Sequence, residues 1–339
     1  GKALKSENMR QWAQEEKPDE LLEKISLFRQ MAEMTLVNDR YLPYRDELLD
    51  LYFQAITFEK TAQRYGEDYV TLIEGSQRNM RARLFCMDPS RQLRKTMDKA
   101  QSTILFSATL RPLDYYRALL TGNDDDETLT LASPFPSYNL CTLVADRIAT
   151  TYRKRHLSYE HIARSLKAFT EGRQGNYLCF FPSYAYMHEV YERFTYLTPQ
   201  IPTLIQEKRM SEQEREEFLD NFTHDQEETL VGFAVMGGIF GEGIDLVGEK
   251  CVGTAVIGVG LPQVCLERNL IRQHFDESRE AGFAYAYQYP GITRVLQAAG
   301  RLIRTEEDRG VLLLIDARFA WETTRRLLPP EWPSLKAVR

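Results

Sequence analysis

Five short apolar segments recur along the second two-thirds of the chain, at 103–106, 177–181, 230–235, 252–259 and 311–315. Several are rich in β-branched residues, and amphipathic helical patterns such as 184–194 and 211–222 lie between most of them. The second helical pattern opens with Ser211-Glu-Gln-Glu214, the sequence of a capping box. Strands that alternate with helices are joined by right-handed crossovers and form a mostly parallel sheet, covered on both faces. The sequence therefore predicts an α/β fold, in which ligands bind at the carboxyl ends of the strands.

The first 66 residues have another pattern and are predicted to be entirely helical. Apolar residues recur at helical spacing from Leu21 to Met31, and do so again after the break at Leu42-Pro43. Short strands are expected at 69–73 and 83–86. Asp88-Pro89-Ser90 then predicts the start of a further helix, with an acid at the N-cap and proline at the first helical position.

Composition and charge exclude few classes of protein. The chain has 339 residues, 43% hydrophobic and 27% charged, which is ordinary for a globular protein of two domains. The net charge of −6 gives no global sign of nucleic-acid binding. Residues 69–100 are a local exception, because they hold seven basic and three acidic residues, a net charge of +4. This basic stretch is either part of a nucleic-acid path or a plain solvated surface.

The five cysteines are scattered, without any C-x-x-C spacing. This pattern argues against a disulfide framework and against a zinc or iron–sulfur site, so we expect no metal ligands in this chain. No apolar run approaches the ~18 residues that a membrane-spanning helix needs, and no signal-peptide pattern opens the chain. The expected location is the cytoplasm, with no membrane partner.

The segment with the strongest chemical content is Gln297-Ala-Ala-Gly-Arg301-Leu-Ile-Arg304, which runs into Gly310-Val-Leu-Leu-Leu-Ile-Asp316-Ala-Arg318. Two arginines three residues apart project from one side of a helix, and the glycine before Arg301 allows close approach of a ligand or backbone. Fixed guanidinium groups recognise phosphates and stabilise the charge of a γ-phosphoryl group during its transfer. The octapeptide by itself fits a solvated arginine-rich surface equally well.

A glycine-rich loop with two acids, Gly237-Gly-Ile-Phe-Gly241-Glu242-Gly243-Ile-Asp245, follows the predicted strand at 230–235. Such a loop turns tightly and presents carboxylates to a ribose, a metal-bound water or an arginine. The alternative is a glycine-rich loop without a ligand. A dinucleotide fingerprint is rejected because the next glycine is Gly248, at the wrong spacing, which removes the support for a nicotinamide oxidoreductase.

Two other predicted strands end in hydroxyl side chains. Ser107 and Thr109 follow the run at 103–106, where such residues are often helix caps. Ser183 and Tyr184 follow the run at 177–181, where they suit a phosphate contact and base stacking. A tyrosine packed into the core is the more common interpretation of Tyr184 in isolation.

Two motifs of nucleotide hydrolases are missing. The sequence has no G-x-x-x-x-G-K-[ST] loop for phosphates and no Asp-Glu-Ala-His or similar acidic pair for magnesium. A complete phosphate-hydrolysing site therefore cannot be assembled from this chain.

Taken in order, four segments resemble the later motifs of the superfamily 2 DNA helicases of the DinG/XPD group. Ile104 to Tyr116 is similar to motif III, and Tyr177 to Tyr184 to motif IV; Gly238 to Gly248 with Gly258 to Pro262 is similar to motif V, and Gln297 to Arg304 with Gly310 to Arg318 to motif VI. The similarity runs from about residue 69 to 330. It implies a RecA-like fold and an ATP-dependent DNA helicase, a class with roles in DNA repair, that moves 5′ to 3′ on single-stranded or forked DNA.

The resemblance also implies a layout. Residues 1–68 would be a helical arch-like segment, 69–124 a remnant of the first motor domain with motif III, and 125–339 the second RecA-like domain. The phosphate loop, the magnesium-binding acids and any iron–sulfur cysteines would lie in a missing N-terminal motor domain. ATP with Mg²⁺ would be shared with that domain, so this chain alone is predicted not to hydrolyse ATP.

Site residues follow from the same resemblance. Gln297, Arg301 and Arg304 would act on the ATP phosphates, with Arg304 as the arginine finger. Domain closure would be coupled to the nucleotide by Gly241, Glu242, Gly243 and Asp245. Closure would be passed to the DNA by Ser107 and Thr109, and single-stranded DNA would be held by Ser183, Tyr184 and Arg209.

A non-catalytic module that binds single-stranded DNA or a partner protein is the alternative function, because a fold alone does not imply chemistry. The glutamine and both arginines favour the motor, since a scaffold has no need of them.

Overall fold

The computed structural model describes residues 10–39, 41–76, 79–223, 228–238, 240, 251–332 and 335–338. The chain forms two compact units. The first consists of Gly1–Leu105, Tyr116–Asp126 and Val264–Ala286, and the second of Phe106–Tyr115, Glu127–Gln263 and Tyr287–Arg339. None of the helices in the described ranges is long and apolar enough to cross a membrane.

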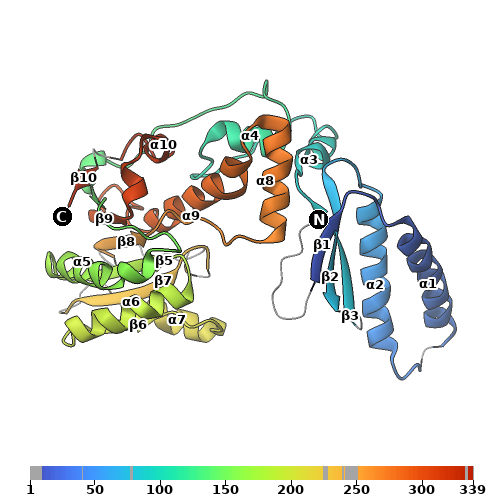
Figure 1. Ribbon diagram of the computed structural model, residues 1–339, viewed down its shortest axis with the longest axis horizontal. Coiled ribbons are helices and arrows are strands. Elements are labelled where there is room, and N and C mark those ends of the chain that lie inside the picture. Colours follow the sequence, from blue (N-terminus) through green and yellow to red (C-terminus); the bar gives the residue numbers. More distant parts are fainter. Residues whose placement is uncertain are drawn as a thin grey trace. The chain divides into compact units, whose positions relative to one another are not determined.

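The first unit combines an antiparallel sheet with a helical hairpin. Its strands, in spatial order, are β1 (Arg10–Gln14), β2 (Tyr69–Ser76) and β3 (Asn79–Cys86). Its helices are α1 (Asp19–Asn38), α2 (Arg45–Ala62), α3 (Ser90–Met97) and α8 (Leu266–Arg279), and it also contains most of α4 (Leu113–Thr121). Helix α2 lies beside β3 and α1 packs along α2 (Figure 1).

Strand β1 contradicts the prediction that the first 66 residues are entirely helical. It pairs with β2 in antiparallel register, with Arg10 opposite Gly75 and Gln14 opposite Thr71. The partner strand is far along the chain, and a long-range pairing of this kind leaves no signal in local periodicity. The two predicted helices around Leu42-Pro43 and the strands at 69–73 and 83–86 are confirmed.

Ion pairs join α8 to the rest of the first unit. Arg83 on β3 pairs with Glu267 at 2.5 Å, and His274 on α8 lies 3.8 Å from the carboxylate of Asp88. Asp88 also accepts a hydrogen bond from the Ser90 backbone at 2.9 Å, so the predicted helix begins at Ser90, with Pro89 as its N-cap residue. Burial acts to raise the pKa of the Asp88 carboxyl, but hydrogen bonds from His274 and Ser90 outweigh it and lower that pKa overall.

The second unit is an α/β domain around a seven-stranded sheet in which every strand pair is parallel. The strands, in spatial order, are β10 (Lys336–Ala337), β4 (Leu140–Ala145), β9 (Gly310–Ile315), β8 (Gly253–Ile257), β5 (Asn176–Phe181), β7 (Leu230–Val235) and β6 (Thr203–Ile205). The helices are α5 (Tyr159–Glu171), α6 (Tyr184–Leu197), α7 (Glu212–Asp220), α9 (Tyr289–Ala299) and α10 (Glu322–Arg325). Short helical turns cover Ser137–Asn139, Arg155–Leu157 and Ala317–Ala320. A π-helical turn at Ala284–Gln288 precedes α9 in the chain, and the boundary between the two units falls within it, after Ala286.

Alternate side chains of the strands enter two cores, one on each face of the sheet. Leu178 and Phe180 of β5 pack in the core that includes α7 and α9, whereas Cys179 and Phe181 pack in the core that includes α5 and α6 (Figure 1). All four side chains are fully buried. The predicted α/β class, with a parallel sheet covered on both faces, is confirmed.

The cysteines are free thiols in this structure. Burial raises the pKa of the Cys251 thiol to about 11, and it raises the pKa of Cys179 as well, so both behave as small apolar core groups. In the described part of the chain, no group of three or more His, Cys, Asp and Glu side chains could hold a metal ion.

Four of the five apolar runs form strands as predicted, and the run at 103–106 does not. It lies in irregular chain, with Ile104 83% and Phe106 89% exposed. A strand needs a neighbour for its backbone N–H and C=O groups, and none of the described strands pairs with this run. The apolar pattern was that of a strand, but the pairing partner is absent from the described chain.

Candidate functional site

A cavity of about 600 Å³ in the second unit brings together two residues from different predicted motifs. Thr109 and Arg304 both line it, although 194 positions separate them in the sequence. The rest of the wall comes from the chain that leads into β4, from the end of α9 and the loop after it, and from the residues before β10. Ser133 and Ser137 add hydroxyl groups to the lining.

The loop that carries Arg304 differs from the prediction. Helix α9 ends at Ala299, so Arg301 and Arg304 lie beyond it and do not project from one side of a helix. The Asp308 carboxylate accepts hydrogen bonds from the backbone N–H groups of Arg304 at 2.7 Å and Thr305 at 2.8 Å. These donors are therefore satisfied by a side chain instead of by helical carbonyls, which holds Arg304 in a loop outside the helix.

Further contacts fix this loop. The Thr305 hydroxyl accepts from the Asp308 backbone N–H at 3.2 Å, which completes a reciprocal pair. Asn139, only 6% exposed, donates its side-chain amide to the Glu306 carbonyl at 2.8 Å and ties the loop to the start of β4. Asp308 is also 6% exposed. Arg304 is thus held by a buried polar network.

The Arg304 guanidinium is half-buried. Burial lowers its pKa, and the nearby Asp308 carboxylate partly opposes that shift. A guanidinium nevertheless stays protonated at neutral pH, so the cavity wall holds a fixed positive charge that is partly stripped of water. Such a group binds a phosphate more strongly than a fully hydrated one.

Gln297 and Arg301 do not line the cavity that Arg304 and Thr109 share. Both are partly buried, and neither belongs to the cavity lining, which instead takes Leu296, Gly300 and Ile303 from this region. The structure therefore brings Arg304 to Thr109 within one unit, and it does not bring the glutamine or the first arginine to the same wall.

The segment with Ser107 and Thr109 forms a small hydroxyl turn. The Thr109 backbone N–H donates to the Ser107 hydroxyl at 3.2 Å, and the two hydroxyl oxygens are 3.3 Å apart. Ser107 is exposed and lies outside the cavity lining, whereas Thr109 lies in it. Arg111, two residues later, also lines the cavity and sits 3.8 Å from the Glu331 carboxylate. Sequence analysis missed Arg111, although a basic residue next to the hydroxyl pair was a usable signal.

Two of the predicted DNA-binding residues, Ser183 and Tyr184, lie at the corner between β5 and α6. Ser183 is the N-cap of α6, and its hydroxyl accepts from the Tyr186 backbone N–H at 3.3 Å. Tyr184 is half-buried against the core, and its phenol oxygen accepts from the Gln206 amide at 2.9 Å. Burial, with a smaller effect of the Glu207 carboxylate, raises the pKa of the Tyr184 phenol.

Positive charge lies close to this corner. The Lys208 ammonium is 6.0 Å from the centre of the Tyr184 ring, and Arg209 follows it as an exposed residue. Gln206, which is 1% exposed, accepts from the Val235 backbone N–H at 2.8 Å and so fixes the loop to the end of β7. The corner holds one half-buried ring and two exposed cations, and Gln206 ties it to β7.

The end of β9 has a structural function. The buried Asp316 carboxylate accepts from the Arg318 side chain through two nitrogens, each at 2.8 Å, and from the Thr150 hydroxyl. The pair joins the end of β9 to the loop that follows β4. The Asp-Ala-Arg sequence after β9 therefore fixes the loop after β4 to the end of β9.

Only part of the glycine-rich loop belongs to the described residues. Gly241, Glu242, Gly243 and Asp245 lie outside the described residues. Gly237, directly before them, has a φ of +67°, and a Cβ at this position would sit 3.0 Å from the Arg294 Nε. Glycine is therefore required at the point where the chain leaves β7.

The basic stretch at 69–100 is largely neutralised in the first unit. Four of its arginines have carboxylate partners within 4.0 Å: Arg81 with Glu74, Arg83 with Glu267, Arg91 with Asp68, and Arg94 with Asp98 and Asp126. Arg78 lies outside the described residues. Three of these partners, Asp68, Asp126 and Glu267, are outside the stretch, so its local charge overstated its basic character.

Comparison with known proteins identifies the family. Residues 166–335 match the family model of the helicase C-terminal domain. This match covers half of the chain and includes β5 to β9, the corner at Ser183 and the loop of Arg304. The chain belongs to the helicase C-terminal domain family, and the resemblance to XPD-type helicases is confirmed.

Relatives agree with this assignment. A probable ATP-dependent helicase of Methanocaldococcus jannaschii is 29% identical over 299 residues, which is 82% of this chain and 43% of that protein. The general transcription and DNA repair factor IIH helicase subunit XPD/RAD3 of Saccharomyces cerevisiae is 24% identical and is matched over 91% of this chain and 41% of its own length. The chain thus spans less than half the length of these relatives.

Solved structures show the same fold. An XPD helicase structure superimposes with a TM-score of 0.63 at 19% identity, over 95% of this chain and 56% of that one. Xpd4 of S. tokodaii gives a TM-score of 0.62 at 16% identity, over 99% of this chain and 62% of its own. At these identities the likeness concerns the fold alone.

Proposed function

We propose that this chain is the C-terminal portion of an ATP-dependent DNA helicase that translocates on single-stranded DNA, 5′ to 3′, and unwinds duplexes. It would supply the arginine-finger half of the ATP site and part of the DNA track, while a separate N-terminal motor domain supplies the other half. In this proposal residues 1–68 are the arch-like segment, 69–124 a remnant of the first motor domain and 125–339 the second motor domain. We also propose that the protein is located in the cytoplasm.

The cavity shared by Thr109 and Arg304 carries the proposal. A half-buried guanidinium on a loop fixed by Asp308 and Asn139 can meet a phosphoryl group without first being ordered. Thr109 in the same wall would sense the occupancy of that phosphate position and pass it, through Ser107, to the DNA track. Gln297 and Arg301 would contribute from the neighbouring surface of α9 and its following turn.

The described residues that line the cavity fit the phosphate end of ATP, the substrate, and not its metal ion. The cavity offers cationic and hydroxyl groups, and its one acidic side chain, Glu331, already faces Arg111. We therefore propose that the Mg²⁺ ligands come from the N-terminal motor domain. Glu242 and Asp245, with Gly241 and Gly243, would couple closure of the two domains to the nucleotide.

The exposed run at 103–106 supports the two-part layout. Its strand-like sequence and its 83% exposed Ile104 and 89% exposed Phe106 fit a segment that completes a sheet with strands supplied from outside this chain. An iron–sulfur cluster, where the whole protein carries one, would belong to that same outside part.

Single-stranded DNA is the proposed partner of the corner at β5 and α6. Tyr184 would stack on bases, and Ser183 and Arg209 would contact phosphates, with Lys208 adding charge. The firm attachment of this corner to β7 through Gln206 supports a role in which movement of the sheet moves the strand.

The test is Arg304→Ala in the full-length protein. Loss of an arginine finger lowers turnover by about 10³–10⁵-fold, with only modest loss of nucleotide binding. DNA-stimulated ATP hydrolysis and binding of a fluorescent ATP analogue are measured together. The matched control is Arg309→Ala, an exposed arginine five positions along the same loop, which should leave turnover within about twofold.

An unchanged rate in Arg304→Ala would remove this residue from the role. If the wild-type full-length protein binds single-stranded DNA and hydrolyses no ATP, the alternative of a non-catalytic binding module replaces the helicase.

A further inference from the structure

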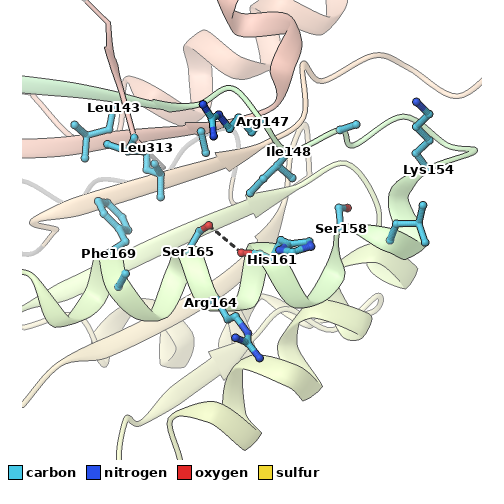
Figure 2. A pocket seen from close by; sticks show the side chains of 15 residues that line it. Leu143, Arg147, Ile148, Lys154, Ser158, His161, Arg164, Ser165, Phe169 and Leu313 are labelled. Atoms are coloured by element: carbon cyan, nitrogen blue, oxygen red, sulfur yellow. Dashed lines mark hydrogen bonds between the residues drawn. The ribbon is translucent and has the colours of Figure 1, made fainter.

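A second cavity of about 750 Å³ lies along α5 in the same unit, away from the residues assigned to ATP or DNA. One wall is a helical stripe on α5 that includes His161, Ser165 and Phe169, at spacings of four residues (Figure 2). The opposite wall is the end of β4 and the loop that follows it, with Leu143 and Ile148. We name this cavity the α5 groove.

The groove exists because the edge of the sheet is not covered on this face. Leu143 and Leu313 point to the same side as α5, since they belong to the core that α5 and α6 cover. Helices α5 and α6 pack over the centre of the sheet, whereas beyond β4 the sheet ends in β10, a strand of two residues. Leu157, 66% exposed, and the exposed Ala168 extend the apolar surface along the groove.

The two serines in the groove have little to offer a polar ligand. The Ser165 hydroxyl donates to the His161 carbonyl of its own helix at 2.8 Å, the contact drawn in Figure 2. The Ser158 hydroxyl donates to the Arg155 carbonyl at 2.7 Å and contacts the Tyr186 hydroxyl at 2.8 Å. The groove floor therefore suits an apolar occupant.

The rim is positively charged. Arg147 and Lys154 extend from the loop after β4, and Arg164 and His161 stand on α5 (Figure 2). None of the residues that line the groove in the described chain is acidic. Arg164 already binds Glu160 at 2.8 Å, so most of the uncompensated charge is that of Arg147 and Lys154 on the loop side. An apolar floor beside a cationic rim matches an occupant that has apolar side chains toward the floor and carboxylates toward the rim.

We infer that the α5 groove docks an amphipathic helix of a partner protein, with an apolar stripe toward the sheet and acidic residues toward Arg147 and Lys154. Helix α5 has 13 residues and is about 20 Å long, which accommodates three to four turns of a parallel or antiparallel helix. A nucleic acid fits less well, because the floor offers it aliphatic groups and one half-buried ring at Phe169 in place of phosphate donors and stacking platforms. The inference does not depend on the ATP site.

The test uses a display library of 16-residue helical peptides selected on this chain, with counter-selection on Ala168→Glu. Ala168 is exposed on the groove side of α5, so the glutamate is compatible with folding while it places a charge on the apolar floor. The enriched peptides should carry apolar residues at i, i+4 and i+7 and an excess of Asp and Glu on one flank. A labelled member of the enriched set is then titrated by fluorescence anisotropy.

We expect Ala168→Glu and the double variant Arg147→Glu with Lys154→Glu each to weaken peptide binding by about tenfold or more. Arg153→Glu, an exposed change on the same loop that is not part of the groove, should leave binding within about twofold. Urea unfolding of each variant checks the fold, and added salt should weaken binding because part of the attraction is between charges.

Three results would overturn the inference: enriched peptides without an acidic excess, binding that survives Ala168→Glu, and failure of the library to yield a groove-dependent peptide. Single-stranded oligonucleotide binding that is lost in the double variant but kept in Ala168→Glu would assign the rim to nucleic acid. Self-association of the chain that disappears in Ala168→Glu would assign the groove to a second copy.

Discussion

The two units of this protein bury apolar surface to very different extents. The seven-stranded sheet of the second unit has a core on each face, and side chains such as Phe180 and Phe233 are fully buried. In the first unit the helical hairpin buries mainly small residues and leaves Met31 61% and Met34 66% exposed on α1. The parallel sheet thus buries its apolar side chains within its own unit, whereas the hairpin leaves apolar side chains exposed.

Helix capping also distinguishes α6 and α7 of the second unit from the helices of the hairpin. Helices α6 and α7 have side-chain N-caps from Ser183 and Ser211, and α7 has a complete capping box. Helices α1 and α2 of the hairpin have Pro18 and Tyr44 as N-cap residues and no side-chain cap. Helices α5, α9 and α10 of the second unit have no side-chain cap either. At α6 and α7 local sequence signals and tertiary burial agree, whereas in the hairpin they diverge, which predicts a stability difference that substitutions can measure.

The largest expected effect comes from a core substitution. Phe233→Ala removes a fully buried ring that stacks on Phe181 and contacts Phe194, and it should cost about 3–5 kcal/mol of unfolding free energy. Met34→Ala on the exposed side of α1 should stay within about 0.5 kcal/mol. Urea denaturation of both variants measures the contrast, and equal losses would show that the hairpin is packed more tightly than its exposure indicates.

A medium effect is expected at Asp308. Asp308→Ala leaves the backbone donors of Arg304 and Thr305 without their acceptor and should cost about 1–3 kcal/mol. The matched change is Asp39→Ala in the first unit, where an exposed carboxylate accepts from the Tyr41 backbone at 2.9 Å and water can replace it. Denaturation curves for the pair should differ clearly, and a neutral Asp308→Ala would remove the carboxylate as the anchor of the loop.

The smallest effect concerns the capping box of α7. Hydrogen bonds from the Ser211 backbone and hydroxyl to the Glu214 carboxylate lower the pKa of Glu214. Its stabilising contribution is therefore fully present above the unfolded-state pKa of about 4.3 and is lost as the pH falls through the lower folded-state value. Wild type and Glu214→Ala are compared by urea denaturation from pH 7 to pH 3. Their difference should shrink only at the acid end, and a constant difference would contradict the assignment.

Sequence reasoning succeeded where the pattern and its physical cause are local or fully buried. The runs that became β5, β7, β8 and β9 are apolar throughout because both faces of the sheet are covered, and the capping box of Ser211 and Glu214 needs only four residues. Strand β4, with Cys141 and Thr142 in its middle, gave no comparable run and was not predicted.

The failures have physical reasons of their own. The run at 103–106 has the composition of a strand but no described partner. The helix predicted through Arg304 stops at Ala299, and Asp308 holds the backbone donors of Arg304 and Thr305 in a separate loop. The two cavities, with Arg111 in one and Ile148, Phe169 and Leu313 in the other, are lined by distant segments of the chain that a linear pattern does not bring together.

The central claim is that this chain holds only one half of an ATP site, with Arg304 as its phosphate-directed group. The most direct measurement is the rate of ATP hydrolysis by the purified chain, with and without single-stranded DNA, alongside its Arg304→Ala variant. We predict no turnover above background in any of these samples. Substantial DNA-stimulated turnover by the chain alone, abolished by Arg304→Ala, would contradict the claim.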